Sequence, residues 1–86
     1  MFFPMDWHLY LLRCGDGTLY CGIALDVEAR VEAHRAGQGA KYTRGRGPLE
    51  LVYRERCGSR SQALKRERAV KALSRAGKLR LIRGGA

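Results

Sequence analysis

The chain has 86 residues, which leaves room for one domain with one modest hydrophobic core and not for two. Apolar residues make up 45% and charged residues 29%, proportions that are typical of a folded protein and exclude bulk disorder. The net charge of +9 predicts a polyanionic partner, while the apolar stretches are far too short to cross a bilayer.

The first residues have neither the basic region nor the cleavage site of a signal peptide. We therefore expect a cytoplasmic protein, with a flexible leader over residues 1–6, a single domain over 7–83 and a tail over 84–86. Met1 and Met5 are both open as the true start. The three cysteines form no Cys-x-x-Cys pair, so we expect reduced, half-buried thiols rather than disulfides or a zinc site.

The positive charge is concentrated in the second half of the sequence. Residues 41–86 hold fourteen basic residues against three acidic ones, a net of +11, whereas residues 1–40 hold three against five, a net of −2. Most of the basic residues are Arg, whose planar guanidinium can pair with phosphate through two hydrogen bonds. The second half is therefore expected to attract nucleic acid, and a merely solvated Arg-rich surface is the alternative.

Two runs of apolar and aromatic residues, 7–14 and 18–23, predict a β-hairpin around the turn Gly15-Asp16-Gly17. The length of the turn decides which side chains share a face, because side chains alternate along a strand. A turn of only two residues would put the tyrosines of the two strands on opposite faces of the sheet.

A turn of three residues instead places Tyr10 opposite Gly22 and puts Tyr10 and Tyr20 on the same face. Gly17 supplies the left-handed residue that such a turn favours. Gly22 has no side chain and so leaves space beside Tyr10. We adopt this register.

The first helix is predicted over residues 27–36, with Asp26 as its N-cap and Gly37 just beyond its end. Arg30 and His34 are four residues apart, so they lie on one flank of this helix. Both side chains are therefore available to a single site.

A glycine-rich basic loop is expected over residues 37–48, followed by a third strand over 49–56. Ser59 and Gln62 form a capping-box pattern, which predicts a second helix running to about residue 75. A short third helix over 77–83 completes the chain. The predicted fold class is α/β (α+β): a small three-stranded antiparallel sheet flanked by two to three helices, in the order β-β-α-β-α(-α).

Glu67 falls in the middle of the inward side of the second predicted helix, between Ala63 and Val70. A carboxylate on an inward face needs a partner, because burying an unpaired charge is costly. A cation at this position, or an ion pair with Arg30 or Lys71, would satisfy it.

Five residues with polar or charged side chains follow one another along the predicted elements: Tyr10, Tyr20, Arg30, His34 and Glu67. Tyr10 ends the pair Leu9-Tyr10, and nine intervening residues separate it from Tyr20-Cys21-Gly22. This order and spacing resemble the GIY-YIG nuclease domain over roughly residues 7–75. The run at 39–48 and the segment at 60–64 resemble the small stand-alone branch of that family. In the first motif His8 replaces the glycine, in the second the middle residue is Cys21, and the sequence contains no Asn to match the family's asparagine.

The resemblance implies hydrolysis of nucleic acid, DNA rather than RNA, with one divalent ion, Mg²⁺ or Mn²⁺. In that reading Glu67 is the metal ligand and Arg30 clamps the scissile phosphate. Tyr10 and Tyr20 would position and activate the attacking water; the resemblance favours the first of them, Tyr10, in this role, and exchanged roles stay open at this point. His34 could accept the proton in turn.

The basic residues after the first helix are expected to contact the nucleic acid through its backbone and shape rather than its base sequence. Guanidinium groups in a flexible loop suit phosphates, and an aromatic ring suits a base. In the glycine-rich loop the candidates are Lys41, Tyr42, Arg44 and Arg46. On the second helix they are Arg60, Lys65, Arg66 and Arg68.

Two other functions compete with a nuclease. The first is a catalytically weak or inactive nucleic-acid-binding module with the same fold, which the replacement at His8 and the absence of Asn favour. The second, ranked lower, is a subunit whose basic face docks an acidic protein partner. We expect no membrane partner, and the sequence leaves the oligomeric state open.

Overall fold

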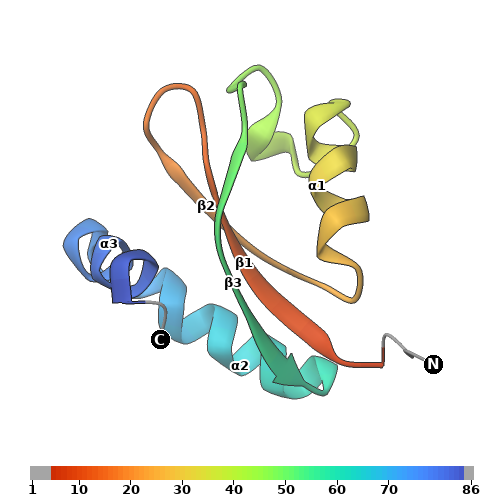
Figure 1. Cartoon of the computed structure of the whole chain (residues 1–86), viewed down its shortest axis with the longest axis vertical. Helices are drawn as coiled ribbons and strands as arrows, with labels where there is room; N and C mark the ends of the chain where they lie inside the picture. The colour runs from red at the N-terminus through yellow and green to blue at the C-terminus, as the bar shows by residue number, and fades with distance from the viewer. Residues whose placement is uncertain (1–4, 85–86) are drawn as a thin grey trace.

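A computed structural model describes residues 5–84, and most of the leader and tail expected at the two ends lies outside this range. Within it, three antiparallel strands form one sheet in the spatial order β2-β1-β3, so β1 is the central strand (Figure 1). The strands are β1 (Trp7–Arg13), β2 (Leu19–Ala24) and β3 (Glu50–Gly58), and the helices are α1 (Val27–Arg35), α2 (Arg60–Lys71) and α3 (Arg75–Gly84). A short 3-10 helix, η1 (Lys41–Thr43), lies in the loop before β3. The predicted fold class and element order are confirmed.

The hairpin has the register that a three-residue turn predicts. Tyr10 lies opposite Gly22, and the turn is closed by the amide of Cys14, which donates to the carbonyl of Thr18 at 2.8 Å. Gly17 has a φ of +85°, a conformation that costs glycine nothing and other residues a steric clash. The turn therefore fixes the face on which both tyrosines of the hairpin lie.

The sheet is covered on both faces, as Figure 1 shows: α1 packs on one face, and α2 and α3 pack on the other. Because β1 is central and covered on both sides, Leu9, Tyr10, Leu11 and Leu12 are all buried, and each is at most 1% exposed. The odd and even positions of β1 thus contribute to two separate hydrophobic clusters, one under α1 and one under α2 and α3.

Capping residues set the starts of the first two helices. The Asp26 carboxylate accepts from the amide of Ala29 at 3.1 Å, and Ser59 and Gln62 form the reciprocal capping box. The expected extent of α2 was wrong: the helix ends at Lys71, and α3 begins at Arg75.

The break between α2 and α3 has a local cause in Ser74. The Ser74 hydroxyl accepts from the amide of Gly77 at 3.1 Å, which satisfies an otherwise free donor at the start of a new helix. The three cysteines carry free thiols, two of them buried and one half-buried. No helix within residues 5–84 is long and apolar enough to span a membrane.

Candidate functional site

Side chains from both helical layers approach the edge strand β2. Tyr10 and Tyr20 lie on the face of the sheet that α1 covers, with 6.3 Å between their ring centroids. Their close approach depends on Gly22, because a Cβ atom built there would lie 2.5 Å from the Tyr10 hydroxyl oxygen. The absent side chain thus provides the space that the Tyr10 hydroxyl occupies.

His34 connects Tyr10 to the loop that follows α1. It is only 2% exposed, and its Nε2 lies 2.8 Å from the Tyr10 hydroxyl oxygen. Its Nδ1 lies 2.9 Å from the hydroxyl of Thr43, which is also buried. The Thr43 hydroxyl in turn lies 2.9 Å from the carbonyl oxygen of Ala40, to which it can donate. A continuous polar chain therefore runs from Tyr10 through the imidazole into η1.

Thr43 and Gly39 hold this imidazole, and sequence reasoning missed both. A Cβ atom on Gly39 would lie 2.2 Å from Nδ1 of His34, so the backbone of the loop packs directly against the ring. The loop was expected to be a substrate-binding segment, whereas part of it forms the wall behind His34. A threonine and a glycine in a loop without periodicity gave no signal of this contact.

Burial controls the protonation of the tyrosine–histidine cluster. It raises the pKa of Tyr10 to about 12, with a further contribution from Tyr20, while the nearby Arg30 guanidinium acts in the opposite direction. The pKa of Tyr20 is also raised, again chiefly by burial. Burial and the positive charge of Arg30 lower the pKa of His34. At neutral pH both phenols therefore keep their protons, and the imidazole is neutral.

Arg30 and Glu67 approach this cluster from opposite layers. Arg30 lies on α1, one turn before His34. Glu67 lies on α2, which packs against β2, and both residues affect the pKa of Tyr20. The Glu67 side chain is 18% exposed and forms an ion pair with Lys71, with 3.4 Å between Oε2 and Nζ. The sheet edge thus lies between one cation and one carboxylate.

In the described part of the chain, Glu67 is not part of a cluster of side chains that could hold a metal ion by themselves. Within residues 5–84, no group of three or more His, Cys, Asp or Glu side chains is close enough to hold a metal ion. Mg²⁺ commonly binds through one or two carboxylates and completes its shell with water and substrate phosphate. The donor set of Glu67 fits that mode of binding and does not fit a metal cage built by protein side chains alone.

The loop residues proposed to contact nucleic acid differ in the side chains that they contact. Tyr42 is 43% exposed and stacks on Tyr20, with ring centroids 5.8 Å apart and planes inclined by 29°. The guanidinium of Arg46 lies 4.4 Å from the centre of the Tyr42 ring and pairs with Asp16 at 2.5 Å. Lys41 and Arg44 are exposed. The aromatic residue of the loop is therefore joined directly to the tyrosine cluster.

The four basic candidates on α2 also differ. Lys65 and Arg68 are exposed, and the Arg60 guanidinium lies 5.6 Å from the centre of the Trp7 ring. Arg66 instead turns toward the sheet and pairs with Glu55 on β3, with Nε–Oε2 and Nη2–Oε1 distances of 2.8 and 3.1 Å. Its guanidinium already has a bidentate carboxylate partner.

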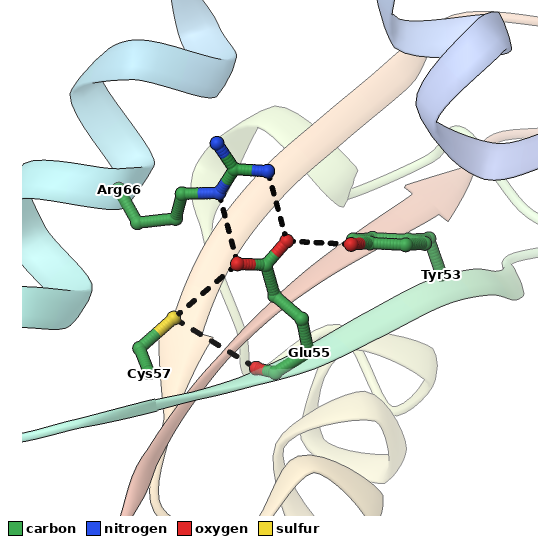
Figure 2. A network of polar contacts seen from close by, with 4 residues as sticks. All are labelled: Tyr53, Glu55, Cys57 and Arg66. Atoms are coloured by element: carbon green, nitrogen blue, oxygen red, sulfur yellow. Dashed lines mark hydrogen bonds and ion pairs between the residues drawn. The ribbon is translucent and has the colours of Figure 1, made fainter. Parts of the chain in front are cut away.

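Figure 2 shows this second polar network, which sequence reasoning missed. The Tyr53 hydroxyl donates to Oε1 of Glu55 at 2.5 Å, and the thiol of Cys57 lies 3.8 Å from the Glu55 carbonyl oxygen. Burial alone would raise the pKa of Glu55, but hydrogen bonds from Arg66 and Tyr53 outweigh it and hold the pKa below its usual value. The polar groups of this network thus pair with one another, on the face of the sheet that α2 and α3 cover.

Comparisons with known proteins agree with this architecture. The sequence matches the GIY-YIG catalytic domain family over residues 6–80. It is 56% identical to a UPF0213 protein of Natronomonas pharaonis, over 90% of this chain and 91% of that protein. It is 55% identical to a UPF0213 protein of Staphylococcus aureus, over 92% of this chain and 98% of that protein.

Two solution NMR structures share the fold. One, the UPF0213 protein BH0048 from Bacillus halodurans, has a TM-score of 0.58 at 45% identity, covering 91% of this chain and 83% of that chain. The other, the protein EF2693 from E. faecalis, has a TM-score of 0.64 at 36% identity, covering 92% and 84%. With the matching fold, motif order and nearly full-length relatives, the chain belongs to the GIY-YIG nuclease family and, within it, to the small UPF0213 proteins.

Proposed function

We propose that this protein hydrolyses phosphodiester bonds in DNA with the help of one divalent cation, Mg²⁺ or Mn²⁺, and that it does so in the cytoplasm. The observation that supports the proposal is at the β2 edge, where Arg30 and Glu67, from opposite layers, both affect the pKa of Tyr20. The Tyr20 ring in turn lies beside the hydrogen-bonded pair Tyr10–His34. Membership of a nuclease family supports the same chemistry.

Tyr10 and His34 form the proton path in this proposal. With its proton on Nδ1, the imidazole donates to Thr43, and its Nε2 accepts from the Tyr10 hydroxyl. The Tyr10 oxygen is then free to accept a proton from the attacking water while its own proton passes to His34. Because the pKa of His34 is lowered, the ring is unprotonated at neutral pH and available as the acceptor.

The other neutral form of the ring does not support this path. The amide of Ala40 lies 3.2 Å from Nδ1 and can donate to it, which favours a proton on Nε2. In that form Nε2 donates to Tyr10, and the phenol has no acceptor for its own proton in His34. The nitrogen-15 chemical shifts of the His34 ring separate the two forms, and the proposal requires Nδ1 to be protonated in the reactive state.

Arg30 and Glu67 supply the charges. Arg30 would bind the scissile phosphate and offset the negative charge that grows in the transition state. Glu67 would ligate the cation, which would polarise the phosphate and stabilise the departing oxygen. Lys71 neutralises Glu67 in the free protein and would have to release it when the cation binds. We therefore expect weak cation binding without substrate.

The decisive test compares the wild type with Glu67→Gln on supercoiled and branched DNA, with Mg²⁺ and with EDTA. We expect nicking by the wild type that EDTA abolishes, and a loss of at least about a hundredfold in Glu67→Gln. Glu50→Gln is the matched control, because Glu50 is an exposed carboxylate on β3 whose Arg13 partner lies 3.9 Å away. Nicking that needs Mg²⁺ but survives Glu67→Gln would refute the assignment of Glu67.

A nucleic-acid-binding module is the second candidate function. The ion pair between Glu67 and Lys71 and the absence of Asn from the sequence favour it. It predicts salt-dependent DNA binding by the wild type, without Mg²⁺-dependent cleavage of any of the DNA substrates. The experiment above therefore decides between the two functions.

A further inference from the structure

A hollow of about 350 Å³ adjoins the candidate site on the side of β2 that faces α3. Its walls combine two aromatic rings, two ammonium groups and two apolar side chains: Tyr20, Tyr42, Lys71, Lys78, Leu19 and Cys21. Tyr20 belongs to both the hollow and the tyrosine cluster, and Lys71 lines the hollow and forms an ion pair with Glu67. A group held here would therefore lie next to the candidate site.

The chemistry of these walls matches one nucleotide. Flat aromatic surfaces attract a base by stacking, and ammonium groups attract the phosphate attached to it. The volume lies within the range of small-molecule sites, roughly 300–1,000 Å³. Within residues 5–84, Lys78 forms no ion pair, so its charge is not already neutralised by a carboxylate.

The Tyr42 ring is held in place before any ligand arrives. Arg46 lies over the ring at 4.4 Å and is itself anchored to Asp16, while Tyr20 stacks against the ring at 5.8 Å. Arg46 is not among the residues that line the hollow, whereas Tyr20 and Tyr42 both line it. A preset ring binds a base at a lower cost in side-chain entropy than a mobile one.

A base inside an intact duplex cannot reach such a surface, because both of its faces are already stacked and its edge is paired. We propose that the hollow holds one unpaired nucleotide of the substrate strand, directly beside the scissile phosphate, with its base packed against Tyr20 and Tyr42 where they line the hollow and its phosphate near Lys71 and Lys78. This inference rests on the proposed function for the kind of polymer. It narrows the substrate to single-stranded, bulged or flapped DNA and disfavours intact duplex.

The test measures binding rather than cleavage, in EDTA, by fluorescence anisotropy with a labelled single strand and a labelled duplex of equal length. The wild type should bind the single strand more tightly than the duplex at the same salt concentration. Tyr42→Ala should weaken single-strand binding about five- to 150-fold, the range for one stacked base, and leave duplex binding nearly unchanged. Tyr42→Phe keeps the ring and should keep the preference.

Lys78→Ala probes the phosphate end of the hollow. It should reduce the slope of log affinity against log salt for the single strand by about 0.7, the value for one phosphate contact. Arg56→Ala is the matched control, because it removes one positive charge on β3, where Arg56 pairs with Asp6. Circular dichroism melting of each variant checks that it is folded, and Tyr42 is exposed enough for alanine to be tolerated.

Equal wild-type affinity for single strand and duplex, or an unchanged preference in a folded Tyr42→Ala, would overturn the proposal. Equal slopes for Lys78→Ala and Arg56→Ala would overturn the phosphate contact. These outcomes are independent of hydrolysis. A protein that nicks DNA but shows no preference refutes the hollow alone, whereas a protein with the preference but no Mg²⁺-dependent nicking refutes the proposed function alone.

Discussion

Tyr10 and Tyr53 lie on opposite faces of the same sheet, and burial is the main cause that raises the pKa of each to about 12. Their hydroxyls nevertheless have different partners. Tyr53 donates to Glu55, and Arg66 neutralises that carboxylate, so every charge in the network has a partner (Figure 2). The Tyr10 hydroxyl is hydrogen-bonded to the neutral imidazole of His34, which can gain a proton.

The same residue type thus contributes to stability on one face of the sheet and suits proton transfer on the other. Proton transfer needs a partner whose protonation state can change near neutral pH, and a carboxylate fixed by a guanidinium does not meet that condition. The Tyr53 network therefore holds β3 to α2, and the Tyr10 network is the one suited to moving a proton. Each of the following changes alters either the contacts of Tyr10 or the network of Tyr53.

The largest effect is expected from removing the two hydroxyls in turn. Tyr10→Phe should lower the rate of Mg²⁺-dependent nicking about a hundredfold or more, because the proton path then lacks its first acceptor. Tyr53→Phe should leave that rate unchanged and reduce the free energy of unfolding by about 1 kcal/mol. Nicking rates and urea unfolding measure both effects. Equal nicking rates in the two variants would remove the functional distinction between the tyrosines.

A methyl group beside the Tyr10 hydroxyl should have the next largest effect. Gly22→Ala places a Cβ atom 2.5 Å from that oxygen, so the ring must move or the strands must separate. We expect a loss of about 1–3 kcal/mol in the free energy of unfolding, the usual cost of overpacking a core. Gly84→Ala is the control, since a Cβ atom there meets no heavy atom within 4 Å. Equal stability of the two variants would show that the site does not need the space at Gly22.

Removing the cation from the network of Tyr53, Glu55 and Arg66 should lower the free energy of unfolding by a smaller amount. Arg66→Ala leaves Glu55 half-buried without its cation, and we expect the free energy of unfolding to fall by about 1 kcal/mol. Arg68→Ala removes an exposed guanidinium from the same helix and should change it by less than about 0.5 kcal/mol. Urea unfolding of both variants at neutral pH measures the difference. If Arg68→Ala destabilises the protein as much as Arg66→Ala, the network of Figure 2 contributes nothing specific.

The smallest effect concerns pH. The pKa of His34 is lowered in the folded protein, so at mildly acidic pH the unfolded chain binds more protons than the folded one. The unfolded chain has the ordinary histidine pKa of about 6.5. Above this pH the full contribution of His34 to the free energy of unfolding is present. As the pH falls below it toward the lower pKa of the folded protein, this contribution is lost. Urea unfolding between about pH 5 and 8 should show this slope, and His34→Gln should lose its share of it. An identical slope in His34→Gln would contradict the assigned protonation.

Local chemistry was enough to predict most of the fold. The turn residues set the hairpin register, and Asp26 and Ser59 set the starts of two helices, because each acts within a few residues. The end of α2 could not be predicted in the same way. Ser74 fits the inward face of a longer helix as well as it fits the cap of a new one, and only the fold decides between them.

Partners distant in sequence were beyond local reasoning. His34 could be placed on a flank of the first helix, but its contact with Thr43 depends on how an aperiodic loop folds back. Arg66 and Arg68 are both arginines on the same predicted helix, so the sequence gives no reason to assign them different roles. Only the packing of α2 on β3 turns Arg66 toward Glu55 and leaves Arg68 exposed to solvent. The candidate residues could therefore be identified, whereas their division of labour could not.

The order of the site's parts along the chain also matters while the protein is being made. Both tyrosines, Arg30 and His34 leave the ribosome well before Glu67, which lies on a helix that follows the last strand. A nascent chain that has emerged only as far as these residues therefore lacks the carboxylate that would bind the cation. Under the proposed function, an unfinished polypeptide does not hydrolyse DNA, and hydrolysis can begin only after α2 has packed against the sheet.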